Sequence, residues 1–451
     1  MKQQLEQTGK ALIVGLGKTG LSCARYLAKQ GLSLAIADSR DKPPGLDALR
    51  EDFPDMALFL GGFQAEVFEA ATQLVVSPGI SLNEPMIKAA KERGAEVLGD
   101  IELFARAVQA PVVAITGSNG KSTVTTLLGE MARAANIKVA VGGNLGEPAL
   151  DLLDEHVDLY VLELSSFQLE STWSLQPKAA VVLNISADHL DRYRDLDDYA
   201  ATKAIIYRQA ETKVVNRDDL RVVEMVSDEA SVVSFSLVAA TGSDFSLQER
   251  GEGNWLCHGN TPLIPVSELR IPGRHNQANA LAALALGSAI GVPIDAMLSA
   301  LRSYTGLPHR TQWVADKQGL HWYNDSKGTN VGATIAALQG LHSEQNESRT
   351  VLIAGGECKD ADFSPLVPVV EQTTRLVILI GRDASDLATV LKGHTKLVLA
   401  TNLQEAVARA IEHAHPGDRV LLSPACASFD MFRDFEARGE AFIEAVEAIA
   451  A

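Results

Sequence analysis

The sequence is poor in cysteine and contains no long apolar run. Its four cysteines are far apart and form no C-x-x-C pair, so we expect neither a disulfide framework nor a structural zinc site. No apolar run approaches the roughly 18 residues that are needed to span a bilayer. The first residues, MKQQLEQTGK, lack the apolar core of a signal peptide. We therefore expect a cytoplasmic protein that does not associate with membranes.

The sequence also lacks a surplus of positive charge. Its formal net charge is −17 and its basic residues are scattered, which disfavours a broad nucleic-acid interface but allows local sites for small anions. The composition, with 46% hydrophobic and 22% charged residues, is typical of a globular protein with an ample core. The length of 451 residues favours about three domains.

A phosphate-binding loop is predicted at residues 117–123, Gly-Ser-Asn-Gly-Lys-Ser-Thr, between a buried strand and a helix expected at 125–134. The backbone N–H groups of such a loop cradle phosphates, the Lys121 ammonium reaches the outer phosphates, and the Ser122 hydroxyl can hold Mg²⁺. The usual glycine six residues before the lysine is replaced by Ile115, so the loop is a shortened variant. The alternative is a turn without a ligand, but we predict a nucleoside triphosphate site.

A second glycine pattern, Gly-x-Gly-x-x-Gly, occupies residues 15–20, and Asp38 ends the next strand-like run. This pattern is typical of a dinucleotide-binding turn, although it also allows simple packing of a helix on a strand. A separate triphosphate loop would be superfluous in a simple dehydrogenase. We therefore favour a nucleotide diphosphate other than NAD at this loop.

Acidic and polar residues follow the strands predicted after the phosphate loop. Glu163 ends the run at 159–162, where a carboxylate can support Mg²⁺ in a phosphate-loop site. Asp188 and His189 follow the next run, and a histidine placed there can ligate a metal or contact substrate. The alternatives are an ordinary strand-end acid and a histidine without a ligand.

Lys203 is predicted to point inward. The residues that share its face of a predicted helix are Tyr199, Ala200, Ile206 and Tyr207, which are mostly apolar. The alternative is a lysine with a buried stem and an ammonium that reaches water.

Short apolar runs alternate with helix-like segments along most of the chain. This alternation predicts an α/β fold built from parallel, doubly wound sheets. We predict a Rossmann-like domain at 1–104, a central phosphate-loop ATPase domain with a parallel sheet at 105–305, and a C-terminal Rossmann-like domain at 306–451. Residues 211–269 have shorter apolar runs, which predict additional small strands.

These motifs together resemble the Mur ligase family over essentially the whole chain. After the phosphate loop, the motifs follow in the order of that family: GGNLG at 142–146, LELSSFQLE at 162–170, ISADHLDRY at 185–193, GRHNQANA at 273–280, LPHR at 307–310 and NDSKGTN at 324–330. Several of them also occur in folylpolyglutamate synthetases. Within the family, the segments GGECKD at 355–360 and SPACASFD at 423–430 resemble the branch that adds D-glutamate.

The resemblance implies an ATP-dependent amide ligase that adds D-glutamate to UDP-N-acetylmuramoyl-L-alanine, through an acyl phosphate and a tetrahedral intermediate, in peptidoglycan precursor synthesis. It implies ATP, the UDP-linked muramoyl peptide and D-glutamate as substrates, two Mg²⁺ ions as cofactors, and a monomer. In the family, the lysine that matches Lys203 is carbamylated. Carbamylation replaces an ammonium that would repel Mg²⁺ with a carboxylate that can hold it.

The resemblance also assigns the site residues to groups. The catalytic group is Lys121, His189, Lys203 and Lys327. The ATP group is Gly117, Ser118, Asn119, Gly120, Lys121, Ser122, Thr123, Asn276, Asn279, Arg310 and Asp325. The UDP-substrate group is Leu16, Thr19, Gly20, Ser39, Arg40, Gly79, Asn144, Gln168 and His189. The D-glutamate group is Thr329, Lys359, Ser428 and Phe435, and the metal group is Ser122, Glu163, His189 and carbamylated Lys203.

Three other functions are less consistent with the sequence. A folylpolyglutamate synthetase-like ligase lacks a Rossmann-like domain before its phosphate loop. A nucleotide-binding switch would not need both an inward lysine beside a metal site and an amino-acid-binding domain. A nicotinamide dehydrogenase would not need the phosphate loop. The three-domain layout further implies domain closure, with hinges near 104–111 and 304–308.

Overall fold

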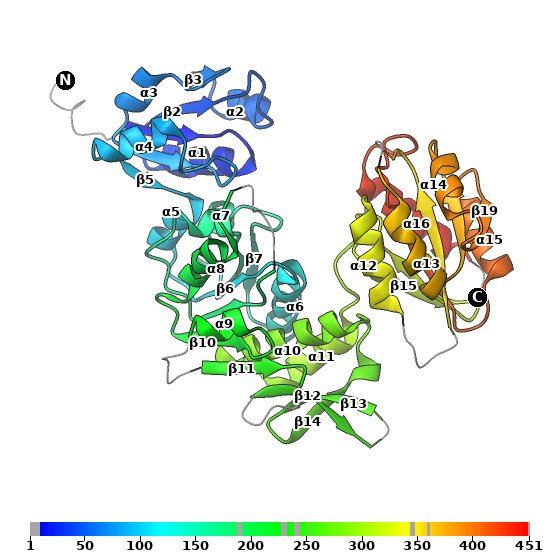
Figure 1. Cartoon of the computed structure of the whole chain (residues 1–451). Coiled ribbons are helices and arrows are strands. Elements are labelled where there is room, and N and C mark those ends of the chain that lie inside the picture. Colours follow the sequence, from blue (N-terminus) through cyan, green and yellow to red (C-terminus); the bar gives the residue numbers. More distant parts are fainter. Residues whose placement is uncertain are drawn as a thin grey trace. The chain divides into compact units, whose positions relative to one another are not determined.

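The computed structural model describes residues 10–186, 192–226, 232–238, 244–251, 253–342, 348–358 and 361–449 (Figure 1). The chain forms two compact units. Unit 1 comprises Met1–Arg250, Trp255–Leu263 and Asn279–Ala300, and unit 2 comprises Gly251–Asn254, Ile264–Ala278 and Leu301–Ala451. The three predicted domain boundaries stay predictions.

The N-terminal part of unit 1 is a five-stranded parallel sheet with the order β3-β2-β1-β4-β5. This is the strand order of a Rossmann-type nucleotide-binding sheet. Its strands are β1 (Lys10–Val14), β2 (Ser33–Asp38), β3 (Ala57–Leu60), β4 (Gln73–Val76) and β5 (Glu96–Leu98). Its helices are α1 (Lys18–Lys29), α2 (Leu46–Asp52), α3 (Ala65–Glu69), α4 (Pro85–Glu92) and α5 (Asp100–Ala107).

Apolar side chains of β1 alternate between the two faces of this sheet. Ile13 belongs to the core that continues into the central part of unit 1, whereas Leu12 and Val14 belong to a separate core on the opposite face. Because successive strand residues point to opposite faces, a strand that is apolar throughout must be covered on both sides. The continuous apolar run of β1 is therefore what places helices on both faces.

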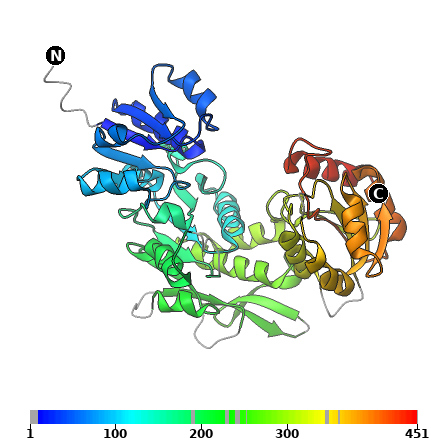
Figure 2. The same ribbon diagram turned by 45° about the horizontal axis from the view of Figure 1, so that its top comes forward.

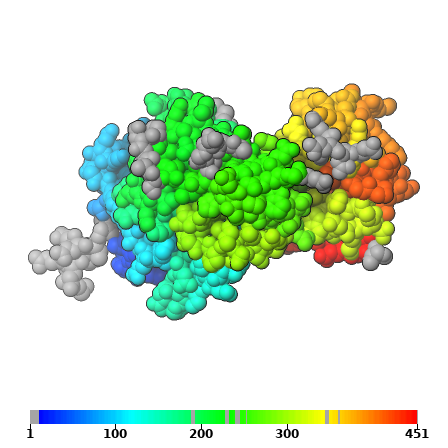
Figure 3. Space-filling model, turned by 90° about the horizontal axis from the view of Figure 1, so that it is seen from below, coloured from blue at the N-terminus to red at the C-terminus, as the bar shows by residue number. Residues whose placement is uncertain are grey.

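The central part of the chain, which lies mostly in unit 1, forms a nine-stranded sheet with the order β14-β13-β12-β11-β10-β9-β6-β8-β7. The strands are β6 (Val112–Thr116), β7 (Val139–Gly143), β8 (Leu159–Glu163), β9 (Ala179–Val182), β10 (Thr212–Asn216), β11 (Val232–Ser236), β12 (Phe245–Arg250), β13 (Gly253–His258) and β14 (Thr261–Pro265). The small strands predicted within 211–269 are confirmed as β10 to β14. The described residues of this region are drawn in green in the space-filling view of Figure 3.

Helices and short 3₁₀ turns lie between the central strands or follow the last of them, β14. They are α6 (Lys121–Ala134), η1 (Ala149–Leu152), α7 (Ser166–Leu169), α8 (Leu196–Ala204), η2 (Ile205–Tyr207), α9 (Leu220–Glu224), η3 (Val266–Glu268), α10 (Arg274–Ala289) and α11 (Ile294–Ser303). Helix α6 begins at Lys121, four residues before the predicted start, because the phosphate loop runs directly into the first helical turn. The lysine and the hydroxyl residues of the loop therefore lie at a helix N-terminus.

The C-terminal part of unit 2 is a six-stranded sheet with the order β15-β16-β20-β17-β18-β19. Its strands are β15 (Gln312–Lys317), β16 (Leu320–Asn324), β17 (Thr350–Gly355), β18 (Thr374–Ile380), β19 (Lys396–Leu399) and β20 (Arg419–Leu422). Its helical segments are α12 (Val331–Leu341), η4 (Ser364–Leu366), α13 (Val367–Thr373), α14 (Ala384–Leu391), α15 (Leu403–His413) and α16 (Phe435–Glu447). The predicted sheet is parallel throughout, but β15 pairs with β16 in antiparallel orientation, because a two-residue turn joins them.

Helices cover both faces of this sheet (Figures 1 and 2). Leu352 and Ala354 of β17 pack into one core with α12 to α14, and Val351 and Ile353 pack into a second core with α15 and α16. This layering confirms the predicted α/β class. No helix among the described residues combines the length and apolar character needed to cross a membrane.

A buried carboxyl group joins the two parts of unit 1. Asp100, at the start of α5, accepts a 2.9 Å hydrogen bond from Gln168 Nε2 of α7, while its other oxygen is buried with no hydrogen-bond partner among the described residues. Burial raises the pKa of Asp100 to about 6. Ionisation of Asp100 above that pH therefore opposes folding.

We expect Asp100→Asn to raise the melting temperature at pH 8 by a few degrees and to leave it nearly unchanged at pH 4. The folded-state pKa lies above the unfolded value, so the stability from Asp100 is present below the unfolded pKa and is lost as the pH rises through about 6. The neutral amide does not have this pH dependence. Thermal unfolding at both pH values tests the prediction, with exposed Asp55→Asn as control, and equal shifts at both pH values would contradict it.

Candidate active site

The phosphate loop between β6 and α6 depends on two glycines in left-handed conformations. Gly117 has a φ of 152°, and a Cβ atom there would lie 3.0 Å from the Leu183 Cβ. Gly120 has a φ of 84°, and its Cβ would lie 2.3 Å from Asn279 Oδ1. No other residue fits either position without displacing a neighbour. Asn279, predicted in the ATP group, therefore lies directly against the loop.

Asn184, just beyond the end of the neighbouring strand β9, holds the phosphate loop. Its Oδ1 accepts a 2.8 Å hydrogen bond from the Asn119 N–H, its Nδ2 donates to the Asn119 carbonyl at 3.1 Å, and its own carbonyl accepts from the Ser118 N–H at 3.0 Å. Sequence reasoning assigned no role to Asn184. Its place just after a buried strand, level with the loop, was the available signal.

The polar side chains beside the loop converge on one carboxylate. Glu163, at the end of β8, is 2% exposed and accepts a 2.7 Å hydrogen bond from Ser122 Oγ and a 2.6 Å hydrogen bond from Asn144 Nδ2. Lys121 Nζ donates to the carbonyls of Gly117 and Ser118, both at 2.9 Å. The ammonium, the hydroxyl and the carboxylate thus surround the start of α6.

Lys203 lies deep in the same part of unit 1. It is 1% exposed, its ammonium donates to Thr116 Oγ1 at 3.3 Å, and it lies 4.7 Å from the centroid of the Tyr199 ring. The Tyr199 hydroxyl accepts from Ser118 Oγ of the phosphate loop at 3.4 Å. The prediction that Lys203 points inward is confirmed, and its ammonium does not reach water.

A cavity of about 530 Å³ opens in unit 1 at the first glycine loop. This volume lies in the usual range for small-molecule sites. Its lining residues are Gly15, Gly17, Lys18, Thr19, Arg40, Ser77, Pro78, Gly79, Ile80, Gly143, Asn144, Gly146, Pro148 and Gln168. The N-terminal and the central parts of unit 1 therefore both contribute to it.

The glycine loop of this cavity is braced by Asp38. The Asp38 carboxylate is buried, accepts from the Leu16 N–H at 2.7 Å, and forms an ion pair with Arg40, whose Nη2 lies 2.7 Å from Oδ2. These contacts lower the pKa of Asp38 to about 2 against the opposing effect of burial. In a dinucleotide site the corresponding acid binds a ribose hydroxyl, but here both oxygens are already engaged. This pairing argues against NAD.

In unit 2, a second cavity of about 450 Å³ lies at the carboxyl ends of β17 and β20. The chain leaves β17 toward β18 on one side, while β20 lies on the other, so this is a topological switch point, where α/β sheets bind ligands. Its lining residues are Thr329, Asn330, Val331, Gly332, Glu357, Cys358, Ala361, Asp362, Ala425 and Ala427.

Asp325 lies at the end of β16 among residues with unusual backbone conformations. It is buried, accepts from Ser423 Oγ at 2.7 Å and from the Thr311 N–H at 3.0 Å, and burial raises its pKa to about 6. His309, Thr311 and Ala425 have φ values of 60°, 42° and 60°. Left-handed non-glycine residues cost energy and concentrate at functional sites.

Arg438 is a buried hydrogen-bond donor that links Ser326 to Cys426, and this role was not predicted from the sequence. It is 1% exposed, and its guanidinium donates to Ser326 Oγ at 3.0 Å, to the Ser326 carbonyl at 2.9 Å and to the Cys426 carbonyl at 3.1 Å. Burial lowers its pKa to about 10, so it stays charged at neutral pH. In the sequence EARGE the residue is indistinguishable from a surface charge, and only packing reveals its role.

Comparisons with known proteins agree with this geometry. The Mur ligase MurD-like N-terminal domain matches residues 9–99, the Mur ligase middle domain matches 115–287, and the Mur ligase glutamate ligase domain matches 309–426. The UDP-N-acetylmuramoylalanine--D-glutamate ligase of Nitrosococcus oceani is 55% identical over 447 residues, which are 99% of this chain and 98% of that protein. The chain belongs to the Mur ligase family. The corresponding ligase of Pseudomonas aeruginosa is 51% identical, over 97% of this chain and 98% of its own.

Solved structures of Mur ligases share the fold at lower identity. MurC from Thermotoga maritima has a TM-score of 0.57 at 18% identity and covers 98% of this chain and 99% of its own. MurF from Acinetobacter baumannii has a TM-score of 0.58 at 20% identity and covers 97% and 91%. The predictions of family and fold class are confirmed.

The structure of this Mur ligase brings together part of the predicted site. Of the predicted UDP-substrate group, five residues line the 530 Å³ cavity: Thr19, Arg40, Gly79, Asn144 and Gln168. Leu16 is buried, and a Cβ on Gly20 would lie 2.0 Å from the Gly15 carbonyl oxygen. Both residues therefore contribute to the packing of the glycine loop and are not among the residues that line the cavity. Ser39 is exposed and is not among the lining residues.

The predicted residues in unit 2 do not all lie at the 450 Å³ cavity. Thr329 lines the 450 Å³ cavity, and Ser428 is buried one residue beyond its lining residue Ala427. Phe435 does not line it; its ring lies 5.0 Å from Lys327 Nζ and 6.1 Å from the His309 ring. Asn276 Nδ2 donates to the Pro272 carbonyl at 2.8 Å, and Arg310 is exposed. The predictions for His189 and Lys359 lie outside the described residues.

Proposed function

We propose that this Mur ligase joins D-glutamate to UDP-N-acetylmuramoyl-L-alanine, with conversion of ATP to ADP and phosphate, in cytoplasmic peptidoglycan precursor synthesis. The observation that carries the proposal is the full-length similarity to enzymes named for this reaction, at 50 to 55% identity. Two cavities of suitable size support it, one at the Rossmann-type glycine loop and one at the switch point of the C-terminal sheet.

The reaction needs an activated carboxyl group, because a free carboxylate has a poor leaving group. The carboxylate of the UDP-linked peptide attacks the γ-phosphorus of ATP and releases ADP, which leaves an acyl phosphate. The amine of D-glutamate then attacks the acyl carbon, and the tetrahedral intermediate expels phosphate. Lys121 and the loop N–H groups offset the repulsion between the anionic reactants.

The residues beside the loop fit a Mg²⁺ ion. Ser122 Oγ and Glu163 Oε2 are oxygen donors 2.7 Å apart at the start of α6, and Mg²⁺ prefers oxygen ligands. Among the described residues, which do not include His189, no group of three or more histidine, cysteine, aspartate or glutamate side chains is positioned to hold a metal. Mg²⁺ would neutralise phosphate charge, with Ser122 and Glu163 as its first ligands and carbamylated Lys203 and His189 as those of a second ion.

The two cavities provide separate sites for the two remaining substrates, the UDP-linked peptide and D-glutamate. We assign the uridine diphosphate to the 530 Å³ cavity, where Arg40 supplies a cation and Gly17, Lys18 and Thr19 of the glycine loop form part of the lining. We assign D-glutamate to the 450 Å³ cavity. Thr329, which lines it, and Ser428 and Lys359, which each follow a lining residue in sequence, would pair with the two carboxylates of D-glutamate. Asn276, Asn279, Arg310, Asp325 and Lys327 would contact ATP.

We expect ADP release to require D-glutamate in an assay with ATP, Mg²⁺ and UDP-N-acetylmuramoyl-L-alanine. L-Glutamate, L-lysine and meso-diaminopimelate serve as competing amino acids, and mass spectrometry identifies the product. ADP release that does not depend on D-glutamate, or that prefers one of the other amino acids, would contradict the proposal.

A further inference from the structure

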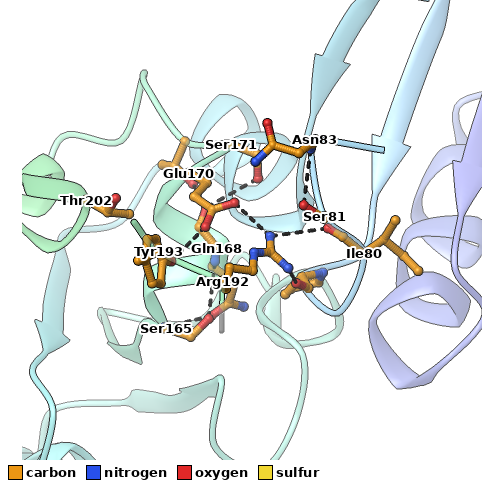
Figure 4. A network of polar contacts seen from close by, with 12 residues as sticks. Ile80, Ser81, Asn83, Ser165, Gln168, Glu170, Ser171, Arg192, Tyr193 and Thr202 are labelled. Carbon is orange, nitrogen blue, oxygen red and sulfur yellow. Dashed lines mark hydrogen bonds and ion pairs between the residues drawn. The ribbon is translucent and has the colours of Figure 1, made fainter. Parts of the chain in front are cut away.

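Arg192 connects the two parts of unit 1 at the edge of the proposed uridine-nucleotide cavity (Figure 4). Its guanidinium donates to the carbonyls of Pro78 and Ile80, both at 3.3 Å, and to Glu170 Oε2 at 2.7 Å. Pro78 and Ile80 line the cavity, but Arg192 does not. An effect of Arg192 on a ligand there is therefore indirect, and Pro78 and Ile80 are the lining residues that Arg192 binds directly.

The 77–80 loop is fixed at one end by the N-terminal sheet. The Ser77 N–H donates to the Val14 carbonyl at 2.9 Å, and Ser77 Oγ donates to the Gly15 carbonyl at 2.9 Å. Beyond Ser77, the loop carbonyls turn toward Arg192. Gly79 stands between the two carbonyls that Arg192 binds, and an added Cβ there would meet no atom within 4 Å, so this part of the loop faces open space.

Arg192 itself is held rigidly from the central part of unit 1. Its side chain is 14% exposed, and the guanidinium carbon lies 4.4 Å from the centroid of the Phe167 ring. Glu170, which is 17% exposed, also accepts a 2.7 Å hydrogen bond from the Tyr193 hydroxyl. A planar guanidinium suits this place, because it can bind two carbonyls and a carboxylate at once while stacking on an aromatic ring.

The same contacts continue toward the phosphate loop. The Tyr193 ring lies 5.2 Å from the Tyr199 ring, and Tyr199 contacts both the Lys203 ammonium and Ser118 Oγ. A continuous set of side chains thus joins the 77–80 loop to the residues around the phosphate loop.

We propose that Arg192 is a positioning residue that holds the 77–80 loop in the conformation that receives the uridine nucleotide. The inference rests on the assignment of that cavity in the proposed function. Loss of the guanidinium frees two loop carbonyls and leaves the Tyr193 hydroxyl as the side-chain partner of Glu170 among the described residues, so the loop becomes less ordered before the ligand binds. Binding of the ligand must then also order the 77–80 loop, and this free-energy cost weakens binding without changing the chemical step.

The test uses two variants. Arg192→Met retains most of the aliphatic stem. Arg192→Lys keeps the positive charge for Glu170 but cannot reproduce the planar guanidinium that binds both loop carbonyls and the Glu170 carboxylate. For Arg192→Met we expect a KM for the UDP-linked peptide that is raised roughly ten-fold or more, from the loss of charge-assisted hydrogen bonds. We expect kcat and the KM values for ATP and D-glutamate to change less than about three-fold. The KM of Arg192→Lys for the UDP-linked peptide should lie between the values for Arg192→Met and for the unchanged enzyme.

The matched control is Arg194→Met. Arg194 is two residues away, its side chain is 83% exposed, and it pairs only with Asp198 of α8 among the ion pairs of the described residues. Its replacement should leave every kinetic constant unchanged. A uniform loss of kcat in Arg192→Met, with a KM that does not rise, would show a general structural role and overturn the inference.

Direct binding separates this inference from the proposed function. Calorimetric titration with UDP alone and with the UDP-linked peptide needs no turnover. If the unchanged enzyme binds neither ligand, the assignment of the cavity fails. If it binds them and Arg192→Met and Arg192→Lys bind them equally well, the inference about Arg192 fails while the proposed function stands.

Discussion

Replacing Lys121 with alanine is expected to reduce ADP formation by roughly a thousand-fold or more. The Lys121 ammonium lies at the start of α6, within 2.9 Å of the Gly117 and Ser118 carbonyls. From this place it can reach the phosphate oxygens that gain charge as the γ-phosphoryl group is transferred. Rapid-quench detection of the acyl phosphate, together with steady-state ADP release, measures the loss.

The Lys121→Ala variant should still bind the UDP-linked peptide with unchanged affinity. The 530 Å³ cavity does not include Lys121 among its lining residues, so loss of the ammonium should not alter it. Exposed Lys138→Ala provides the control for removal of a lysine from the same part of unit 1. Acyl phosphate formed at the normal rate by Lys121→Ala would contradict the role of this residue, and loss of peptide binding would point to misfolding of the loop instead.

The sequence predicted the parts of the site that follow from backbone chemistry. Gly117 and Gly120 lie where left-handed φ angles are needed, and the sequence pattern located both loops that depend on such glycines. The inward direction of Lys203 was predictable because helical periodicity determines which face is buried. The alternation of strands and helices similarly predicted layered α/β sheets, although it could not distinguish the antiparallel β15 from its parallel neighbours.

The sequence did not predict the residues that act through packing over long distances. Asn184, Arg438 and Arg192 each bind main-chain groups of segments that are distant in sequence, and such contacts leave no periodic pattern. The pairing of Asp38 with Arg40 is another case, since the same acid at a strand end is also typical of a ribose ligand. Only the observed geometry shows that both of its oxygens are already engaged.

Lys203→Ala is expected to lose ligase activity to an extent similar to that expected for Lys121→Ala. Short carboxylic acids or bicarbonate are expected to restore part of this activity. An unmodified ammonium in this 1%-exposed place contacts the Thr116 hydroxyl and the Tyr199 ring, and it would repel a neighbouring metal ion. Carbamylation reverses the charge. The alanine variant leaves space in which a small carboxylate can replace the carbamate.

Two controls make the Lys203 experiment decisive. Lys203→Arg fills the same space with a cation that cannot be carbamylated, so it should be inactive and should not respond to added acids. Lys178→Ala removes a partly exposed lysine that pairs with Glu211, and it should keep full activity. Full activity of Lys203→Ala would defeat the carbamate hypothesis. A folded but inactive Lys203→Ala that no acid restores would instead assign Lys203 to its contact with Tyr199 and, through Tyr199, to support of Ser118 in the phosphate loop.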